Sequence, residues 1–205
     1  VETLTTLYKK YELRRLLADL TKNDTNDSAK TDDSIDDTDA VATESDIEAE
    51  YELILNKADF QTWLEKLSAA EVFAFDTETT SVNYQKAELV GLSFAVEAGK
   101  AAYVPVAHDY LGAPEQLDRN WVLEQLKPLL ESETQSKVGQ NLKYDANVLS
   151  HYGINMNGIT FDTMIESYCL NSVATRHNMD ALAEKYLGYK TVHFEDIAGK
   201  GAKQL

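Results

Sequence analysis

Residues 21–50 are the segment that most limits how this chain can fold. They are rich in Asp, Ser, Thr, Asn and Ala and contain almost no large apolar side chain. Such a composition buries too little apolar surface to offset the entropy lost on ordering. We therefore predict a disordered acidic linker over residues 21–50. A short helical tail, residues 1–20, precedes it, and a folded domain, residues 51–205, follows it.

The linker also holds most of the negative charge. The formal net charge of the chain is -16, and residues 23–50 contain 11 acidic side chains and one basic side chain. A net negative charge of this size usually argues against a surface that binds nucleic acid. Because more than half of the excess lies in one segment, the charge does not exclude nucleic-acid binding by residues 51–205. For the linker itself we favour a solvated spacer over a nucleic-acid mimic or an interaction tail.

The tail has the apolar spacing of a short amphipathic helix over residues 3–20. The side chains at helical spacing are Leu4, Leu7, Tyr8, Tyr11, Leu16 and Leu20. An isolated helix of this length has nothing to pack against, so it is either frayed or the end of a domain whose body is missing.

Cysteine content and hydropathy limit the cellular setting. One cysteine, Cys169, excludes an intramolecular disulfide and a Cys-rich zinc module, and its apolar surroundings predict a buried small hydrophobe. No run approaches 18 apolar residues and no basic-then-apolar leader opens the chain, so we expect a soluble, cytoplasmic protein without a membrane partner. The chain starts at Val1 and stops without completing an element, which suggests a fragment of a longer polypeptide.

From Tyr51 onward, apolar residues alternate between strand and helix periods. Three consecutive strands suggest an antiparallel meander, and the units after them alternate between helix and strand. We therefore predict an α/β fold with a mixed sheet flanked by helices. The expected strands are 51–55, 72–76, 89–96, 101–106, 137–139 and 159–161, and the expected helices are 58–69, 121–130, 141–152, 163–170 and 178–187.

A buried strand that ends in two acids is the main sign of chemistry. Asp76 and Glu78 follow the apolar run 72–75 and, two residues apart in a strand, face the same side. Two hard carboxylate oxygens at one point form a divalent cation site. The alternative is that the strand has ended and both acids begin a solvated turn. Asp145 lies one turn into a helix that Asn141 can cap, either as a third ligand or as an ordinary exposed acid.

Other polar residues carry weaker signals. Asp162 follows a short strand, and we favour an N-cap for the next helix over a catalytic role. The four histidines lack the spacing of zinc ligands and are expected to be structural or exposed, although His177 and Arg176 are placed to meet an anionic ligand. The sequence has no phosphate-binding loop, nucleophile elbow or dinucleotide fingerprint, which argues against nucleotide-triphosphate hydrolysis, serine-hydrolase and dinucleotide redox chemistry.

Residues 73–79, 139–145 and 161–183 resemble the proofreading 3′–5′ exonuclease domain of bacterial DNA polymerase I, a family A polymerase. The resemblance runs over residues 51–205. The tail resembles the end of the preceding 5′ nuclease domain of such a polymerase. Three connecting segments are also similar to that family: Val90–Phe94, Tyr103–His108 and Ile197–Gly201.

The resemblance implies a ribonuclease H-like fold and the chemistry of enzymes named for four acids, Asp-Glu-Asp-Asp. In these enzymes two divalent cations, Mg²⁺ or Mn²⁺, or Zn²⁺ at one site, lie roughly 3.5–4 Å apart and promote phosphodiester hydrolysis. By the family pattern Asp76 would bridge both ions, Glu78 would hold the first, and Asp145 would bind the second through water. These three are the expected catalytic and metal-binding residues.

The resemblance also implies partners and substrate contacts. The substrate would be the 3′ end of single-stranded DNA, and the polymerase and 5′ nuclease domains would belong to the same polypeptide, in the nucleoid of a bacterial cytoplasm. Val82 is smaller than the Leu that the family often has, and Phe194 has a plain alternative as a core aromatic. The expected contacts are Thr79 and Val82 at the terminal nucleotide, Gln140, Asn141 and Tyr144 along the strand, Arg176 at phosphate, and Phe194 against a base.

One departure from the family limits the expected activity. The fourth acid, in a Tyr-x-x-x-Asp motif, should follow Ile197 by some tens of residues, and the chain stops before it. We expect the fold to be C-terminally incomplete and these 205 residues alone to bind metal poorly and cut slowly. Two other interpretations stay open: an inert nucleic-acid-binding or spacer domain of the polymerase, and an RNA-trimming exonuclease with the same acids.

Overall fold

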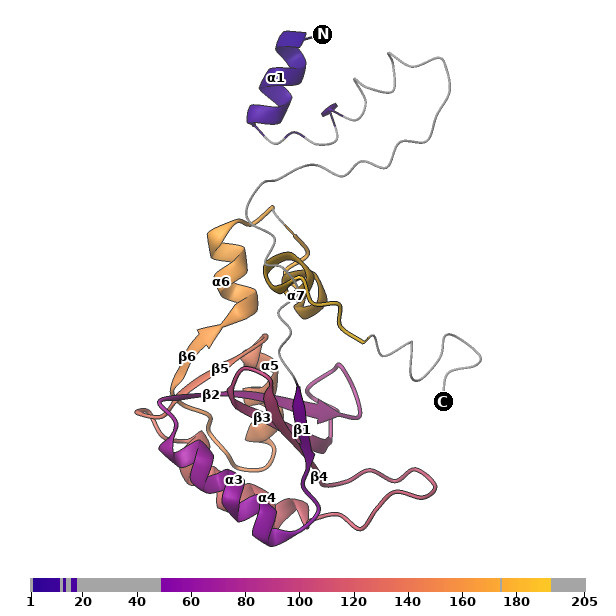
Figure 1. The fold of residues 1–205 in the computed structure, drawn as a ribbon, viewed down its shortest axis with the longest axis vertical. Helices are drawn as coiled ribbons and strands as arrows, with labels where there is room; N and C mark the ends of the chain where they lie inside the picture. The colour runs from indigo at the N-terminus through magenta and orange to yellow at the C-terminus, as the bar shows by residue number, and fades with distance from the viewer. Residues whose placement is uncertain (1, 12, 14–15, 18–48, 174, 193–205) are drawn as a thin grey trace. The chain divides into compact units, whose positions relative to one another are not determined.

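The computed structural model describes residues 2–11, 13, 16–17, 49–173 and 175–192, in two compact units that divide after Asp39. In the first unit, helix α1 spans Glu2–Lys10 (Figure 1). The predicted helix over residues 3–20 is interrupted, because α1 ends at Lys10 and the backbone N–H of Leu13 bonds to the carbonyl of Tyr8, five residues back, which breaks the four-residue repeat. Residues 12, 14–15 and 18–20 of that prediction lie outside the described residues. The predicted linker lies almost wholly outside the described residues.

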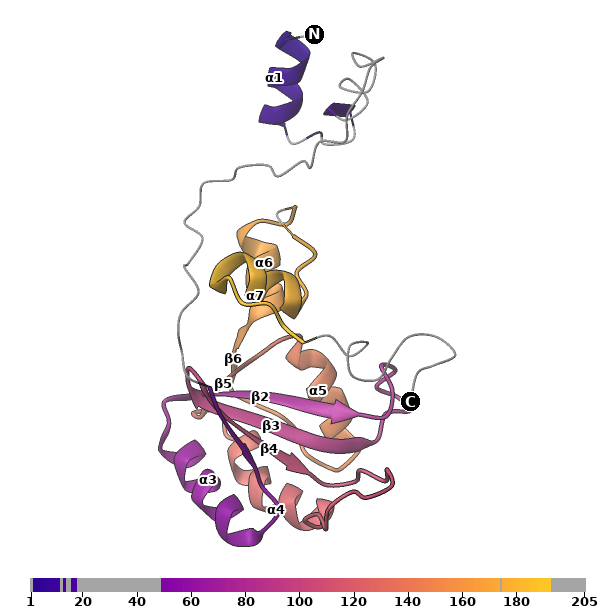
Figure 2. The ribbon, with the colours of Figure 1, turned by 45° about the vertical axis from the view of Figure 1, so that its right-hand side comes forward.

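The second unit is built on a six-stranded sheet with the order β1-β4-β3-β2-β5-β6 (Figures 1 and 2). Strands β2, β3 and β4 form the predicted antiparallel meander, while β1 pairs with β4, β2 with β5 and β5 with β6 in parallel. The expected mixed α/β sheet is confirmed. The strands are β1 Glu50–Leu53, β2 Val72–Thr79, β3 Leu89–Glu97, β4 Lys100–Pro105, β5 Ser136–Gly139 and β6 Ile159–Asp162.

This pairing gathers strand ends at one edge. Strand β3 runs against both of its neighbours, so the other described strands all point the same way. Their carboxyl ends therefore share an edge, which carries Glu78 of β2, Gly139 of β5 and Asp162 of β6. In open α/β sheets, ligands bind beyond the carboxyl ends of the strands.

Helices form where the apolar periodicity predicted them, with ends shifted by a few residues. Helices α3 and α4 lie side by side in both views (Figures 1 and 2). Asn56 caps α3 through bonds from the backbone N–H groups of Ala58 and Asp59. The helices are α3 Lys57–Ala69, α4 Arg119–Leu130, α5 Leu142–Ser150, α6 Thr163–Leu170 and α7 Met179–Leu187.

Alternation along β2 separates the core from the acids. Phe73, Phe75 and Thr77 are buried on one face, where Phe75 packs against Phe94 of β3 with ring centroids 5.7 Å apart. Burying such a ring stabilises the fold by about 1.5–3 kcal/mol. Asp76 is only half-buried and Glu78 is exposed, on the opposite face. Helices α3, α4 and α5 complete the core with Phe60, Trp63, Leu67, Val122, Leu123, Leu126, Leu130, Leu142, Val148 and Leu149.

The predicted burial of Cys169 is wrong. Its side chain is exposed on α6, where the apolar side chains Ile165, Tyr168 and Leu170 are exposed as well. Within α6 the buried residue is Ser167, so the apolar sequence of this helix is not matched by packing against the described parts of the chain. No helix in the described ranges is both long and apolar enough to cross a membrane.

Candidate active site

The two acids of β2 stand at the carboxyl edge of the sheet opposite small residues. Asp76 pairs with Ser93 and Glu78 pairs with Gly91 across the β2–β3 ladder. The ladder shifts register directly after Glu78, an irregularity that often redirects a side chain beside an active site. Strand alternation and small neighbours leave both carboxylates on the less covered face.

Asp145 reaches the same strand from α5. Its side chain is only 2% exposed, and its Oδ1 accepts two hydrogen bonds from Thr77, one from the backbone N–H at 2.9 Å and one from the hydroxyl at 2.6 Å. Thr77 therefore fixes the acid of α5 against β2. Sequence reasoning missed Thr77, although its place in the buried series 73, 75, 77 was a signal that its hydroxyl needed a partner.

Burial and like charges shape the electrostatics of the site. Burial, followed by the charges of Asp145 and Glu78, raises the pKa of Asp76 to about 7. Burial also raises the pKa of Asp145, although the two bonds from Thr77 act in the opposite direction. The ion pairs among the described residues include none of these acids. The site therefore concentrates negative charge that a bound cation would neutralise.

The donor chemistry fits a hard divalent cation, because the three candidate ligands all present carboxylate oxygens. In the part of the chain that the structure describes, however, no three acidic, histidine or cysteine side chains gather into a metal site. One oxygen of Asp145 bonds to Thr77, and the charges of Asp145 and Glu78 add to the raised pKa of Asp76.

Asp162 caps two helices. Its carboxylate accepts from the backbone N–H groups of Met164 and Ile165 at the start of α6, which confirms the predicted N-cap. It also accepts from the N–H groups of Asn141 at 3.1 Å and Leu142 at 2.9 Å. The predicted side-chain cap by Asn141 is wrong: its backbone is left-handed instead of extended, and its side chain makes no capping bond to α5. Asn141 has a left-handed φ of 60°, and its Oδ1 is buried without a partner in the described structure.

Two of the expected substrate residues, Thr79 and Tyr144, contact each other at the end of β2, and a third, Val82, lies in the loop that follows. The hydroxyls of Thr79 and Tyr144 are 2.5 Å apart, and Tyr144 also donates to the carbonyl of Ser81. Val82 follows in the same loop and is 97% exposed. Residues from β2, its following loop and α5 are thus assembled at one place.

The other expected contacts are more scattered. Gln140 donates to the carbonyl of His177 at 2.8 Å and accepts from Thr163, and Arg176 is exposed between α6 and α7. His177 is buried and its ring bonds to Ser167, which confirms a structural role. Phe194 lies outside the described residues.

Sequence reasoning also missed a polar pair beside Glu78. The hydroxyl of Tyr103 lies 2.6 Å from Nε2 of His108. Burial, followed by the charges of Glu78 and Tyr110, raises the pKa of Tyr103 to about 12. Because Tyr103 lies on the next strand but one, only the sheet register could reveal that it neighbours Glu78.

Comparisons with known proteins agree with this geometry. Residues 51–205 match the family model described as 3′–5′ exonuclease. DNA polymerase I of Pseudomonas aeruginosa is 51% identical over 206 residues, which cover 100% of this chain and 22% of that protein. DNA polymerase I of Rhizobium leguminosarum is 40% identical over 168 residues, covering 74% of this chain and 16% of that protein. The chain thus spans about a fifth of the length of these curated relatives.

Solved structures share the fold at low identity. The POL domain of Pol1 from M. smegmatis, in complex with DNA primer-template and dNTP, has a TM-score of 0.55 and 18% identity, covering 67% of this chain and 23% of that one. RNase D of Trypanosoma brucei has a TM-score of 0.56 and 16% identity, covering 72% of this chain and 50% of that one. The predicted ribonuclease H-like fold is confirmed. Together with the family match, this shows that the chain belongs to the 3′–5′ exonuclease domains of bacterial DNA polymerase I.

Proposed function

We propose that residues 51–205 are the proofreading domain of a bacterial DNA polymerase I, which hydrolyses the 3′-terminal phosphodiester of single-stranded or frayed DNA. The observation that carries the proposal is the placement of Asp76 and Glu78 at the carboxyl edge of the sheet, with Asp145 held against the same strand by Thr77. In this account residues 1–20 end a 5′ nuclease domain and residues 21–50 tether it, in a cytoplasmic, nucleoid-associated enzyme.

Exonuclease domains of this superfamily are metal-dependent. Two divalent cations, when bound, would activate the attacking water and offset the charge of the displaced phosphodiester. Asp76, Glu78 and Asp145 would hold them, and hard carboxylate oxygens favour Mg²⁺, with Mn²⁺ as a substitute. Thr77 would orient Asp145 for metal binding through its two hydrogen bonds, which also favour the ionised form against the effect of burial.

The residues around the acids support a path for a single strand. Thr79, Tyr144 and exposed Val82 would contact the terminal nucleotide beside Glu78. Gln140 and Asn141, at the start of α5, would contact the preceding nucleotides. We assign phosphate binding to Arg176 and base contact to Phe194.

Metal affinity should depend on pH. Because the pKa of Asp76 is raised to about 7, its carboxyl group is largely protonated at lower pH and must lose that proton when a cation binds. The Mn²⁺ dissociation constant should fall by about tenfold per pH unit up to pH 7 and level off above it. Titration of the chain with Mn²⁺ between about pH 5.5 and 8.5, followed by electron paramagnetic resonance, measures this. An affinity independent of pH would contradict the assignment of Asp76 as a ligand.

The function is tested with a 5′-labelled single-stranded oligonucleotide in Mg²⁺ or Mn²⁺. We expect a ladder that shortens from the 3′ end and that stops when the 3′ end is blocked. The 205-residue chain is compared with a chimera in which it replaces the matching segment of the P. aeruginosa polymerase, which supplies the remaining domains. The chain alone should cut more slowly than the chimera.

Two results would contradict the proposal. If a folded chain and a folded chimera both leave the strand intact, the domain is an inert spacer. If a matched RNA strand is shortened faster than the DNA strand, the RNA-trimming interpretation replaces ours. The match to DNA polymerases favours DNA.

A further inference from the structure

Gly91 lies opposite Glu78 and has no side chain, and the hydroxyl of Tyr103 fills the space that a side chain at Gly91 would occupy. The sheet register pairs Glu78 with Gly91, and Ser93 with both Asp76 and Tyr103, so Tyr103 rises from the same face as the two acids. A Cβ added at Gly91 would lie 1.8 Å from the Tyr103 hydroxyl oxygen. Cβ atoms of directly opposed residues are about 4.5–5.5 Å apart. The hydroxyl is therefore within reach of the carboxylate of Glu78.

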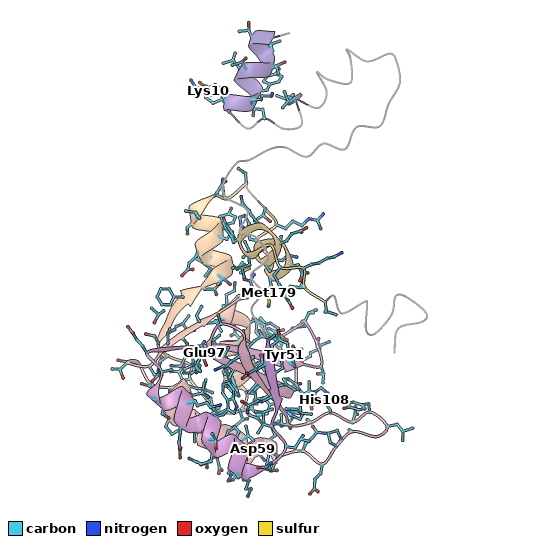
Figure 3. The ribbon with its side chains drawn as sticks, viewed as in Figure 1. Lys10, Tyr51, Asp59, Glu97, His108 and Met179 are labelled. Carbon is cyan, nitrogen blue, oxygen red and sulfur yellow. The ribbon has the colours of Figure 1, made fainter. Side chains whose placement is uncertain are left out.

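His108 fixes the position of that hydroxyl. Nε2 of His108 lies 2.6 Å from the Tyr103 hydroxyl oxygen. His108 lies in the loop after β4, and its side chain is half-buried (Figure 3 labels it). The side chain of Gln116 accepts from the backbone N–H of His108 at 2.8 Å and donates to its carbonyl at 2.7 Å. The histidine is thus held by both of its main-chain polar groups.

The number of protons that Tyr103 and His108 can donate decides which of them donates the hydrogen bond between them. A tyrosine hydroxyl has one proton to donate, and a neutral imidazole donates from one nitrogen. When Nε2–H of His108 donates to the Tyr103 oxygen, the hydroxyl proton is free to point at Glu78. The negative charge of Glu78 favours this arrangement, because a hydrogen bond to an ionised carboxylate is stronger than one to a neutral acceptor.

We propose that Tyr103 and His108 are positioning residues that orient the carboxylate of Glu78 for cation binding. The inference rests on the proposed function, since it takes Glu78 as a ligand. Glu78 is exposed and has rotamers that point away from Asp76, so a donor on its far side restricts it to the productive ones. The segment Tyr103–His108 thereby gains a role in the active site.

The test compares Tyr103→Phe with Tyr110→Phe, which removes a hydroxyl from the other tyrosine ring that packs against His108. Mn²⁺ binding to the 205-residue chain is measured by electron paramagnetic resonance without DNA. Tyr103→Phe should weaken binding roughly tenfold, as the loss of a group that orients a metal ligand does. Tyr110→Phe should not, and neither variant should lower the melting temperature by more than a few degrees.

Two further variants separate positioning from general damage. In a Glu78→Gln background, Tyr103→Phe should have no additional effect. His108→Gln, whose amide N–H reaches the same oxygen, should bind Mn²⁺ more tightly than His108→Ala. The inference would be overturned if Tyr103→Phe and the unsubstituted chain bound Mn²⁺ with equal affinity. It would also be overturned if Tyr103→Phe weakened binding as much in the Glu78→Gln background as without it. Either result would leave the proposed function standing. Absence of Mn²⁺ binding by the unsubstituted chain would overturn the proposed metal centre and this inference with it.

Discussion

Replacing Asp76 by asparagine is expected to abolish exonuclease activity while making the metal-free domain more stable. The amide has the shape of the protonated acid but cannot bind a cation as an anion, so cutting should slow by at least on the order of 10³-fold. Most substitutions that remove catalysis through misfolding lower stability as well. Opposite changes in activity and stability therefore identify Asp76 as a functional acid.

The sign of the stability change follows from proton linkage. The folded pKa of Asp76 is about 7 and its ordinary value is 3.8, so folding favours the protonated form. The stability from that form is fully present below pH 3.8 and is lost as the pH rises through 7. Asparagine does not ionise, so the Asp76→Asn variant keeps this stability as the pH rises. At pH 8 without metal, Asp76→Asn should exceed the unsubstituted chain by up to about 4 kcal/mol in free energy of unfolding.

Urea unfolding at pH 5 and pH 8, in chelator and then in Mg²⁺, measures this difference. Glu71→Gln is the matched control, since Glu71 is exposed and immediately precedes the same strand. The advantage of Asp76→Asn should shrink at pH 5 and in Mg²⁺, which stabilises only the ionised acid. A variant that is less stable at pH 8 in chelator would show that Asp76 supports the fold instead.

Asp162→Ala is expected to lower the free energy of unfolding by about 1–4 kcal/mol, because capping side chains contribute about 0.5–2 kcal/mol per helix and Asp162 caps two. Its carboxylate accepts four backbone N–H groups, two at the start of α5 and two at the start of α6. The melting temperature should fall by about 2–15 °C for a domain of this size. Because α5 also carries Asp145, metal affinity should fall with it.

Asp118→Ala is the matched control for this prediction. Asp118 caps α4 alone and accepts from the N–H of Trp121, so its loss should cost about 1 kcal/mol. Asp162→Asn keeps one acceptor oxygen and should be intermediate. Circular dichroism melts of the three variants give the comparison. An Asp162→Ala variant no less stable than Asp118→Ala would contradict the double cap.

Local patterns were enough to predict the main elements. Alternation of Phe73 and Phe75 with smaller residues predicted β2, and the abrupt change to Asp76 and Glu78 left two alternatives, a cation site or the start of a solvated turn. The fold class follows from these periods because each element needs one apolar surface to pack. Asp145 needed the family resemblance, since nothing within its own helix distinguishes it from an exposed acid.

Contacts between distant segments could not be predicted in this way. Asn141 has the residue type of an N-cap, yet its side chain makes no capping bond, and Asp162, 21 residues later, accepts from the first N–H groups of α5. The bond from Thr77 to Asp145 joins residues 68 positions apart. The contact of Tyr103 with the position of Gly91 depends on the sheet register, which local periodicity does not define.

Anomalous diffraction from crystals of the chain soaked in Mn²⁺ is the most direct test of the central claim, that these acids form a metal-dependent active site. The account predicts an anomalous peak bonded to the carboxylates of Asp76 and Glu78, with a second ion near Asp145, and no peak in Asp76→Asn crystals. Peaks confined to other acids, with β2 unoccupied at saturating Mn²⁺, would contradict it.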